Sequence, residues 1–333
     1  MPSSPRQRRL PRRLLLPCGG CSLVMSVLAI MAANSLASQV PSITPTATGQ
    51  REQAHAVIPL DHARELLNTE HWQDAAPVVK AYFVAHPDSG EAHALMGLIL
   101  YREHQPRASM AEYLQASQST DLSAFDLRIF AMDCAAIPDF PEAEKWLLRS
   151  LEKDNRDAAT WEALGHVRFS SQHYEEAIDA LQHTLQLTPR MVSAETLIGL
   201  ANERLARLDV AETAYRTAIQ WQTDGKGQDA VPFIALGRVL LVNNQPADAI
   251  SWLQQAEKIA PTSSEAHEQL GLAFAKTGHT PEAAQELETA IRLQPDSARL
   301  HLMLARTYRS LGEKEKADRE FEQYAKLNGS NPQ

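Results

Sequence analysis

The chain has 333 residues, of which 44% are hydrophobic and 6% aromatic, and its formal net charge is −9. This length suits a few ordinary domains or one long repeat array, and the many Ala, Leu, Glu and Gln residues favour helix over strand. Residues 1–37 contain five arginines and no acidic residue, so the rest of the chain is still more acidic. An acidic body excludes nucleic acid as the main partner, because binding phosphates requires a cationic surface.

Residues 1–37 have the order of a secretory signal. An arginine-rich start is followed by the uncharged residues 14–33, and Ser35 and Ala37 are small residues suited to a cleavage site. An uncharged stretch of this length can also span a bilayer, so the alternatives are a cleaved signal peptide, an uncleaved signal anchor, or neither. The first two both place the body outside the cytoplasm, because the arginines remain inside. We therefore expect an extracytoplasmic protein, periplasmic or secreted, or one anchored in the inner membrane by residues 14–33.

Residues 38–55 follow with Pro41, Pro45 and several Ser and Thr residues, a composition typical of a flexible spacer. Cys18 and Cys21 have no second pair and no nearby His, and Cys134 is alone in the body. This spacing predicts neither a metal site nor an internal disulfide.

Three series of residues recur through the rest of the chain with a period of 34 residues, interrupted by one shift of four. The first series is nearly all Ala: Ala75, Ser109, Ala143, Ala177, Ala211, Ala249, Ala283 and Ala317. The second lies twelve residues upstream and is Gly or Ala throughout: Ala63, Gly97, Ala131, Gly165, Gly199, Gly237, Gly271 and Ala305. The third lies four residues after the first and is large: Val79, Tyr113, Leu147, Leu181, Tyr215, Leu253, Leu287 and Phe321. Prolines close four repeats at one common position: Pro87, Pro189, Pro261 and Pro295.

These series predict pairs of antiparallel helices. Two helices approach closely only where side chains are small, which the Gly/Ala and Ala positions permit, and the large residue one turn further fills the space beside them. The proline ends the second helix before the next repeat.

The repeat resembles the tetratricopeptide repeat family, most fully at Trp161, Leu164, Gly165, Tyr174, Ala177, Leu181 and Pro189. The resemblance implies an all-α fold, a right-handed α-solenoid superhelix of about eight helix-turn-helix repeats. In this register the solenoid covers 56–331, with repeats at 56–89, 90–123, 124–157, 158–191, 192–229, 230–263, 264–297 and 298–331. Residues 223–228 hold the four extra residues as a loop, and the charged last helix around Phe321 is expected to be a solubilising cap.

Motifs for chemistry are not found. His267-Glu268 begins like a zinc-protease motif, but Gly271 replaces the second His. His93, His267 and His301 each occupy the fourth residue of a repeat, which favours inter-repeat packing or a wet helix face over metal binding. We predict a protein that is not an enzyme and has no cofactor or metal.

The resemblance also implies that first helices line a concave groove. The candidate peptide-binding residues that it gives are Arg64, Tyr101, Arg102, Phe125, Arg128, His166 and Phe169, and further positions in the C-terminal half include Arg238 and Glu265. Arginine binds carboxylates in a fork and aromatic residues supply contact area, so this set suits an extended peptide with an acidic element. Arg64, Leu98, Met132 and His166 stand where the carboxylate clamp of some relatives requires Asn, so that clamp is excluded.

The sequence therefore predicts a non-catalytic scaffold in the cell envelope that binds a protein or peptide of unknown identity, and not nucleic acid. The alternative is a non-catalytic subunit of a larger envelope enzyme or of a secretion or assembly complex.

Overall fold

The computed structural model describes residues 59–222 and 228–329. The chain divides into two units, Met1–Ala54 and His55–Gln333, and the first of them lies outside the described residues. The expected signal segment 1–37, the spacer 38–55 and most of the inserted loop at 223–228 therefore also lie outside them. No helix within the described residues is long and apolar enough to cross a membrane.

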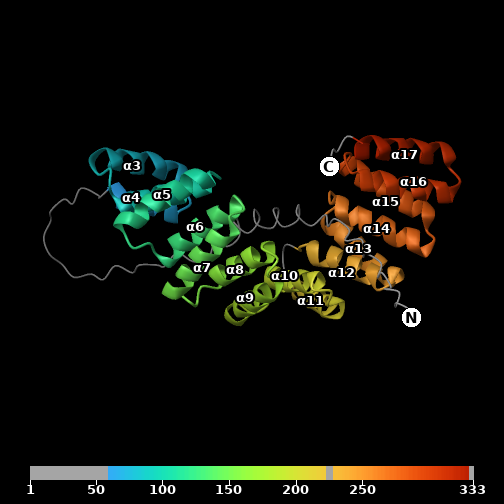
Figure 1. Ribbon diagram of the computed structural model, residues 1–333, viewed down its shortest axis with the longest axis horizontal. Helices are drawn as coiled ribbons and strands as arrows, with labels where there is room; N and C mark the ends of the chain where they lie inside the picture. The colour runs from blue at the N-terminus through green and yellow to red at the C-terminus, as the bar shows by residue number, and fades with distance from the viewer. Residues whose placement is uncertain (1–58, 223–227, 330–333) are drawn as a thin grey trace, which may run out of the picture. The chain divides into compact units, whose positions relative to one another are not determined.

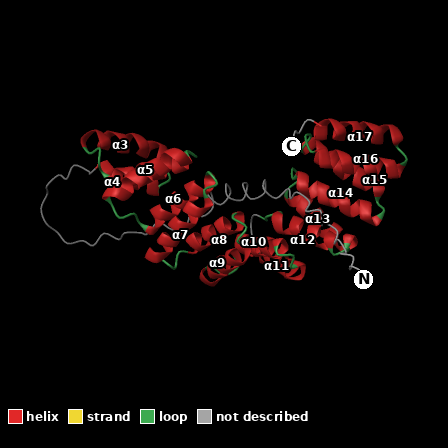
Figure 2. Ribbon diagram, viewed as in Figure 1, coloured by secondary structure: helices red, strands yellow, loops and turns green. Residues whose placement is uncertain are grey.

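The described residues form sixteen helices in eight antiparallel pairs, and Figure 2 shows helices joined by short loops. The first helices of the pairs are α2 (Pro59–Asn68), α4 (Gly90–Arg102), α6 (Ala124–Ala136), α8 (Ala158–Ser170), α10 (Val192–Arg204), α12 (Val231–Val242), α14 (Ser264–Thr277) and α16 (Ala298–Leu311). The second helices are α3 (Trp72–Ala85), α5 (Pro106–Ser119), α7 (Phe140–Lys153), α9 (Tyr174–Leu187), α11 (Leu208–Gln222), α13 (Pro246–Ile259), α15 (Thr280–Leu293) and α17 (Lys314–Gly329). The predicted fold class, an all-α array of about eight helix-turn-helix repeats, is confirmed.

Each helix packs mainly against its neighbours in the chain, so the core is a continuous layer between successive helices (Figure 1). Each first helix from α2 to α12 also contacts the next first helix. An array of this kind has no single central core, and each repeat is stabilised by the repeats on either side.

The Gly position of the first helix is set by the large residue of the second helix. A Cβ atom added to Gly237 would lie 2.5 Å from Cγ of Leu253, and one added to Gly199 would lie 2.5 Å from Cε1 of Tyr215. The Leu253 and Tyr215 side chains are fully buried. The three sequence series thus describe one steric contact that recurs along the array.

The turn between the paired helices has a signature that the sequence analysis missed. In seven repeats one turn residue has a positive φ, between 58° and 84°: Glu70, His104, Gln172, Ala206, Asn244, Gly278 and Gly312. Only the last two are glycine, the residue that adopts this conformation without steric cost. The turn therefore leaves no residue-type signal in most repeats.

Three histidines connect successive repeats. The Nδ1 atoms of His93, His267 and His301 lie 2.6–2.7 Å from carboxylate oxygens of Glu112, Glu286 and Glu320 on the second helix of the same repeat. Their Nε2 atoms lie 3.0–3.1 Å from the carbonyl oxygens of Pro87, Pro261 and Pro295 in the preceding loop. Of the two alternatives for these histidines, the structure supports inter-repeat packing.

The array ends in a polar helix. Ala317 is the buried residue of α17, and Phe321 is partly covered by the guanidinium of Arg309, 4.6 Å from the ring centroid. This arrangement agrees with a solubilising cap.

The first prediction concerns the recurring steric contact. Replacing Gly237 with Ala overpacks Leu253, which costs about 1–3 kcal/mol, while the better helix propensity of Ala returns roughly 1 kcal/mol. We expect a net loss of about 1 kcal/mol in the free energy of unfolding, measured by urea titration with circular dichroism. In a Leu253→Ala background the same substitution should stabilise by roughly 1 kcal/mol, because the space is then open and only the gain in helix propensity remains. Equal losses in both backgrounds would show that the Gly position is not set by Leu253.

Candidate functional site

The seven candidate residues lie on the first helices of the first four repeats. Arg64 is on α2, Tyr101 and Arg102 are on α4, Phe125 and Arg128 are on α6, and His166 and Phe169 are on α8. Consecutive helices of this set contact each other, so the residues come from neighbouring elements of the array. We call these seven residues the first-helix set.

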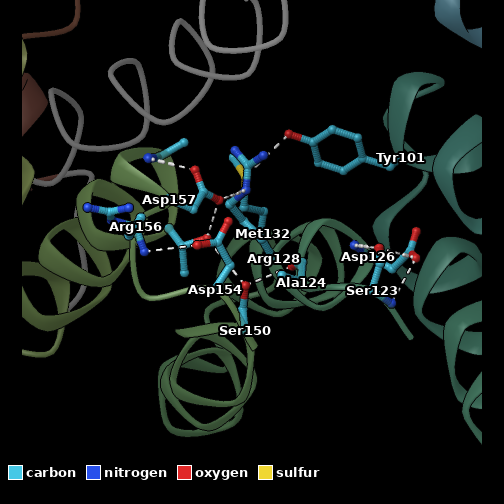
Figure 3. A network of polar contacts seen from close by, with 12 residues as sticks. Tyr101, Ser123, Ala124, Asp126, Arg128, Met132, Ser150, Asp154, Arg156 and Asp157 are labelled. Carbon is cyan, nitrogen blue, oxygen red and sulfur yellow. Dashed lines mark hydrogen bonds and ion pairs between the residues drawn. The ribbon is translucent and has the colours of Figure 1, made fainter. Parts of the chain in front are cut away.

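Two pairs of side chains lie on α4 and α6. The Tyr101 hydroxyl lies 3.6 Å from Sδ of Met132, and the Arg128 guanidinium lies 5.3 Å from the centroid of the Phe125 ring. Figure 3 shows the Tyr101 hydroxyl directed toward Met132 and Arg128. The structure thus brings aromatic area and a guanidinium together across the second and third repeats.

Asp157 holds Arg128 in place. Its Oδ2 atom lies 3.2 Å from Nε of Arg128, in an ion pair whose alignment is too poor for a hydrogen bond. The same carboxylate accepts hydrogen bonds from the backbone N–H of Ala159 at 3.1 Å and from the Thr160 hydroxyl at 2.6 Å, capping α8. Arg128 is 5% exposed, so its charge serves the joint between the third and fourth repeats.

The other two arginines of the set differ from each other. Arg64 forms ion pairs with Asp61 and Glu91. Arg102 is partly exposed and forms no ion pair with any carboxylate of the described chain. Of the three, Arg102 is therefore the one whose charge is free to meet a ligand.

His166 and Phe169 are buried rather than exposed. Burial lowers the pKa of His166 to about 4, so its ring is neutral near pH 7 and offers no positive charge. Phe169 is 6% exposed and packs edge-on against Tyr174, with centroids 5.4 Å apart. Near them, Glu162 accepts a hydrogen bond from the Ser193 hydroxyl at 2.6 Å, and burial raises the pKa of its carboxyl.

Two arginines of the C-terminal half are neutralised by neighbours. Arg238 lies between two carboxylates, with Nε 2.9 Å from Glu203 and Nη1 2.8 Å from Glu265. Arg299 pairs with Glu268 at 2.7 Å. These charges connect successive repeats in the same way as Arg128 and Asp157.

A buried carboxyl beside Tyr101 was missed by the sequence analysis. Asp133 is 2% exposed, and burial raises the pKa of its carboxyl to about 7. Burial is the main cause of this shift, and the interaction of the carboxyl with the Ser109 side chain opposes it. The Ser109 hydroxyl itself donates to the Gly97 carbonyl at 2.7 Å. An alignment of the repeats could have identified Asp133, because the equivalent residues in the neighbouring repeats, Ile99 and Val167, are apolar.

Cys134 is fully buried. Burial raises the pKa of its thiol to about 12, which disfavours the reactive thiolate. It acts as a small apolar residue of the core.

Paired helices in linear succession, with candidate ligand residues on the first helices, define a helical-repeat scaffold. A family model described as tetratricopeptide repeat matches residues 60–124, 162–227 and 268–332, which is more than half of the chain. The chain belongs to the tetratricopeptide repeat family, whose members are protein-binding scaffolds and typically non-catalytic. The family resemblance inferred from the sequence is confirmed.

Solved structures agree with this fold. A tetratricopeptide repeat protein from Parabacteroides merdae has a TM-score of 0.57 at 13% identity, covering 75% of this chain and 97% of that one. The Cut9–Hcn1 hetero-tetramer of the APC/C has a TM-score of 0.56 at 16% identity, covering 83% of this chain and 54% of that one. Pseudomonas aeruginosa pilF has a TM-score of 0.52 at 21% identity, covering 63% of this chain and 94% of that one. No curated protein matches the chain. At these identities the likeness shows the fold alone.

The second prediction concerns Asp133. The carboxyl has a pKa of about 7 in the folded protein and an ordinary value of 3.8, so between these two pH values the folded state binds more protons than the unfolded state. The free energy of unfolding therefore falls as pH rises from about 3.8 to about 7, and this group makes no further change to it above pH 7. Asp133→Asn removes this dependence. We expect the variant to gain on the order of 3 kcal/mol relative to wild type between pH 4 and pH 7, because one pKa unit corresponds to about 1.4 kcal/mol.

Urea unfolding at pH 4, 5.5, 7 and 8 measures this gain. Asp179→Asn, at an exposed position of α9, is the matched control and should follow the wild-type curve. An Asp133→Asn curve parallel to wild type across this range would contradict the assignment.

Proposed function

We propose that the protein is an exported scaffold of the cell envelope that holds an extended protein segment along its first helices. In this proposal Arg102 binds a carboxylate of the ligand, while Tyr101 and Phe125 supply apolar contact area. Arg64 and Arg128 shape the surface through their ion pairs and do not carry the ligand charge.

The observation that carries the proposal is the state of Arg102. It is partly exposed, it follows Tyr101 directly on α4, and it has no carboxylate partner in the described chain, whereas Arg64 and Arg128 are paired. A guanidinium beside an aromatic ring binds carboxylates well, because the ring adds contact area to a bidentate charged hydrogen bond. Contacts between successive first helices support a continuous binding surface, since residues from neighbouring repeats then lie within reach of one peptide.

The location proposal rests on residues 1–37. Five arginines precede an uncharged segment that ends in small residues, which is the order of an export signal. Export places the first-helix set outside the cytoplasm, so the proposed ligands are envelope or secreted proteins.

The third prediction tests the ligand surface. The full chain, immobilised through a C-terminal tag, is exposed to envelope extract as wild type, as Arg102→Ala/Phe125→Ala, and as the control Arg107→Ala. Arg107 is exposed on α5, the second helix of the same repeat, so its variant matches the loss of charge but leaves the first helices unchanged. We expect wild type and control to capture one acidic partner and the double variant to bind it at least tenfold more weakly, a loss of about 1.4 kcal/mol.

Circular dichroism confirms that the double variant is folded, and titration with synthetic acidic segments of the captured partner locates the ligand. Equal capture by all three proteins would remove the first-helix set from consideration. Co-purification of the double variant in a fixed stoichiometric complex would favour the alternative, a subunit of a larger assembly.

The fourth prediction tests location. Expressed in a bacterial host and fractionated, the protein should be found in the periplasm or in the inner membrane. N-terminal sequencing then separates the two forms, because cleavage after Ala37 gives Ser38 as the first residue and an uncleaved anchor keeps residues 14–33. Recovery of intact protein in the cytosol would contradict export.

A further inference from the structure

Three repeats share one histidine–glutamate pair, and one of them has an additional ligand group. In each pair Nε2 lies within 3.1 Å of a proline carbonyl oxygen, which can only accept, so Nε2 carries a proton and donates it. The Nδ1 atom then faces the glutamate carboxylate at 2.6–2.7 Å. This separation is that of a hydrogen bond, so a metal ion that replaces the shared proton needs the two atoms about 3.3 Å apart, which a small movement of the glutamate side chain allows.

The additional group is found by comparing the repeats in register. At the position in the preceding second helix that faces the histidine, the second repeat uses Phe83, whose ring centroid lies 4.8 Å from that of His93. The equivalent residue for the last repeat is Ile291. For the seventh repeat it is Glu257, so an apolar packing residue is replaced by a second carboxylate.

Glu257 converges with the histidine–glutamate pair in space. One ligand atom each from Glu257, His267 and Glu286 lie within 4.8 Å of one another. His267 is 4% exposed, and the two glutamates are partly exposed. Glu257 forms no hydrogen bond or ion pair with the described chain, whereas Glu286 is bonded to His267. One carboxylate of the cluster is therefore already paired within the chain, and the other is open to solvent or to a ligand.

We propose that Glu257, His267 and Glu286 form a Zn²⁺ site. Two carboxylates balance the charge of a divalent cation, and one imidazole with two carboxylates is a ligand set that zinc accepts, with bonds of about 2.0–2.2 Å. The contact between Nε2 of His267 and the Pro261 carbonyl at 3.1 Å supplies the outer hydrogen bond that fixes the tautomer and aims Nδ1 at the metal. Water completes the coordination sphere on the exposed side.

The site joins three helices. Glu257 lies on α13, His267 on α14 and Glu286 on α15, so bound zinc connects the sixth repeat to the seventh. Because each repeat is stabilised by its neighbours, a bond across this joint stiffens the C-terminal part of the array.

Zinc stoichiometry tests the site. The full chain is equilibrated with ZnCl2 and dialysed, and bound zinc is counted in wild type, in Glu257→Gln and in the control Glu282→Gln, an exposed residue of α15 with the same change of charge. We expect Glu257→Gln to bind one zinc ion fewer per chain than wild type and the control to bind the same number as wild type. Zinc held elsewhere cancels in this difference.

A variant that should create a second zinc site tests the proposal without relying on loss of binding. Ile291→Glu places the missing carboxylate beside His301 and Glu320, and should add one zinc ion per chain. In thermal unfolding, zinc should raise the midpoint of wild type but raise that of Glu257→Gln less, since a ligand stabilises only the state that binds it. Equal stoichiometry and equal thermal shifts in wild type and Glu257→Gln would overturn the proposal, whatever Ile291→Glu does.

Discussion

The close approach of two helices at a glycine or alanine is the contact on which the rest of this structure depends. At Gly237 and Gly199 the space for a side chain is already taken by Leu253 and Tyr215 of the paired helix. The contact fixes how the two helices of a repeat lie against each other, and that arrangement creates the faces on which the next repeat packs. Since no central core exists to absorb an error, the contact must recur with a constant period, which is why it is so legible in the sequence.

Many of the charged residues form ion pairs that connect one repeat to the next. Arg128 with Asp157, and Arg238 with Glu203 and Glu265, are partly or fully buried pairs that connect one repeat to the next. An acidic protein with several arginines on one side therefore presents less free positive charge than its sequence suggests. The side chains that can meet a ligand are those left unpaired after these ion pairs form. On the first helices of the N-terminal half they are Arg102, Tyr101 and Phe125.

Departures from the repeat are the most informative positions for function, because packing alone explains the residues that do recur. Asp133 stands where neighbouring repeats place Ile99 and Val167, and it becomes a buried carboxyl with a pKa of about 7. Glu257 stands where other repeats place Phe83 and Ile291, and it adds a carboxylate to a histidine–glutamate pair. Each departure replaces an apolar contact with a titratable group, a change that costs stability unless a proton, partner or metal ion compensates it.

The helical class, the pairing of helices and the family could all be predicted from the sequence, because these depend on side-chain size at a fixed spacing that recurs eight times along the chain. It also placed the candidate residues on the first helices, since position within a repeat follows from the period. Which charges remain free depends on the tertiary structure: Arg102 and Arg128 look alike in sequence, but Asp157, the N-cap residue of α8, neutralises only Arg128. The burial of His166 and the convergence of Glu257 on His267 are likewise properties of neighbouring helices in space. The exposure of a side chain and its partners depend on groups that are distant in the sequence. The period of the repeat does not specify those groups.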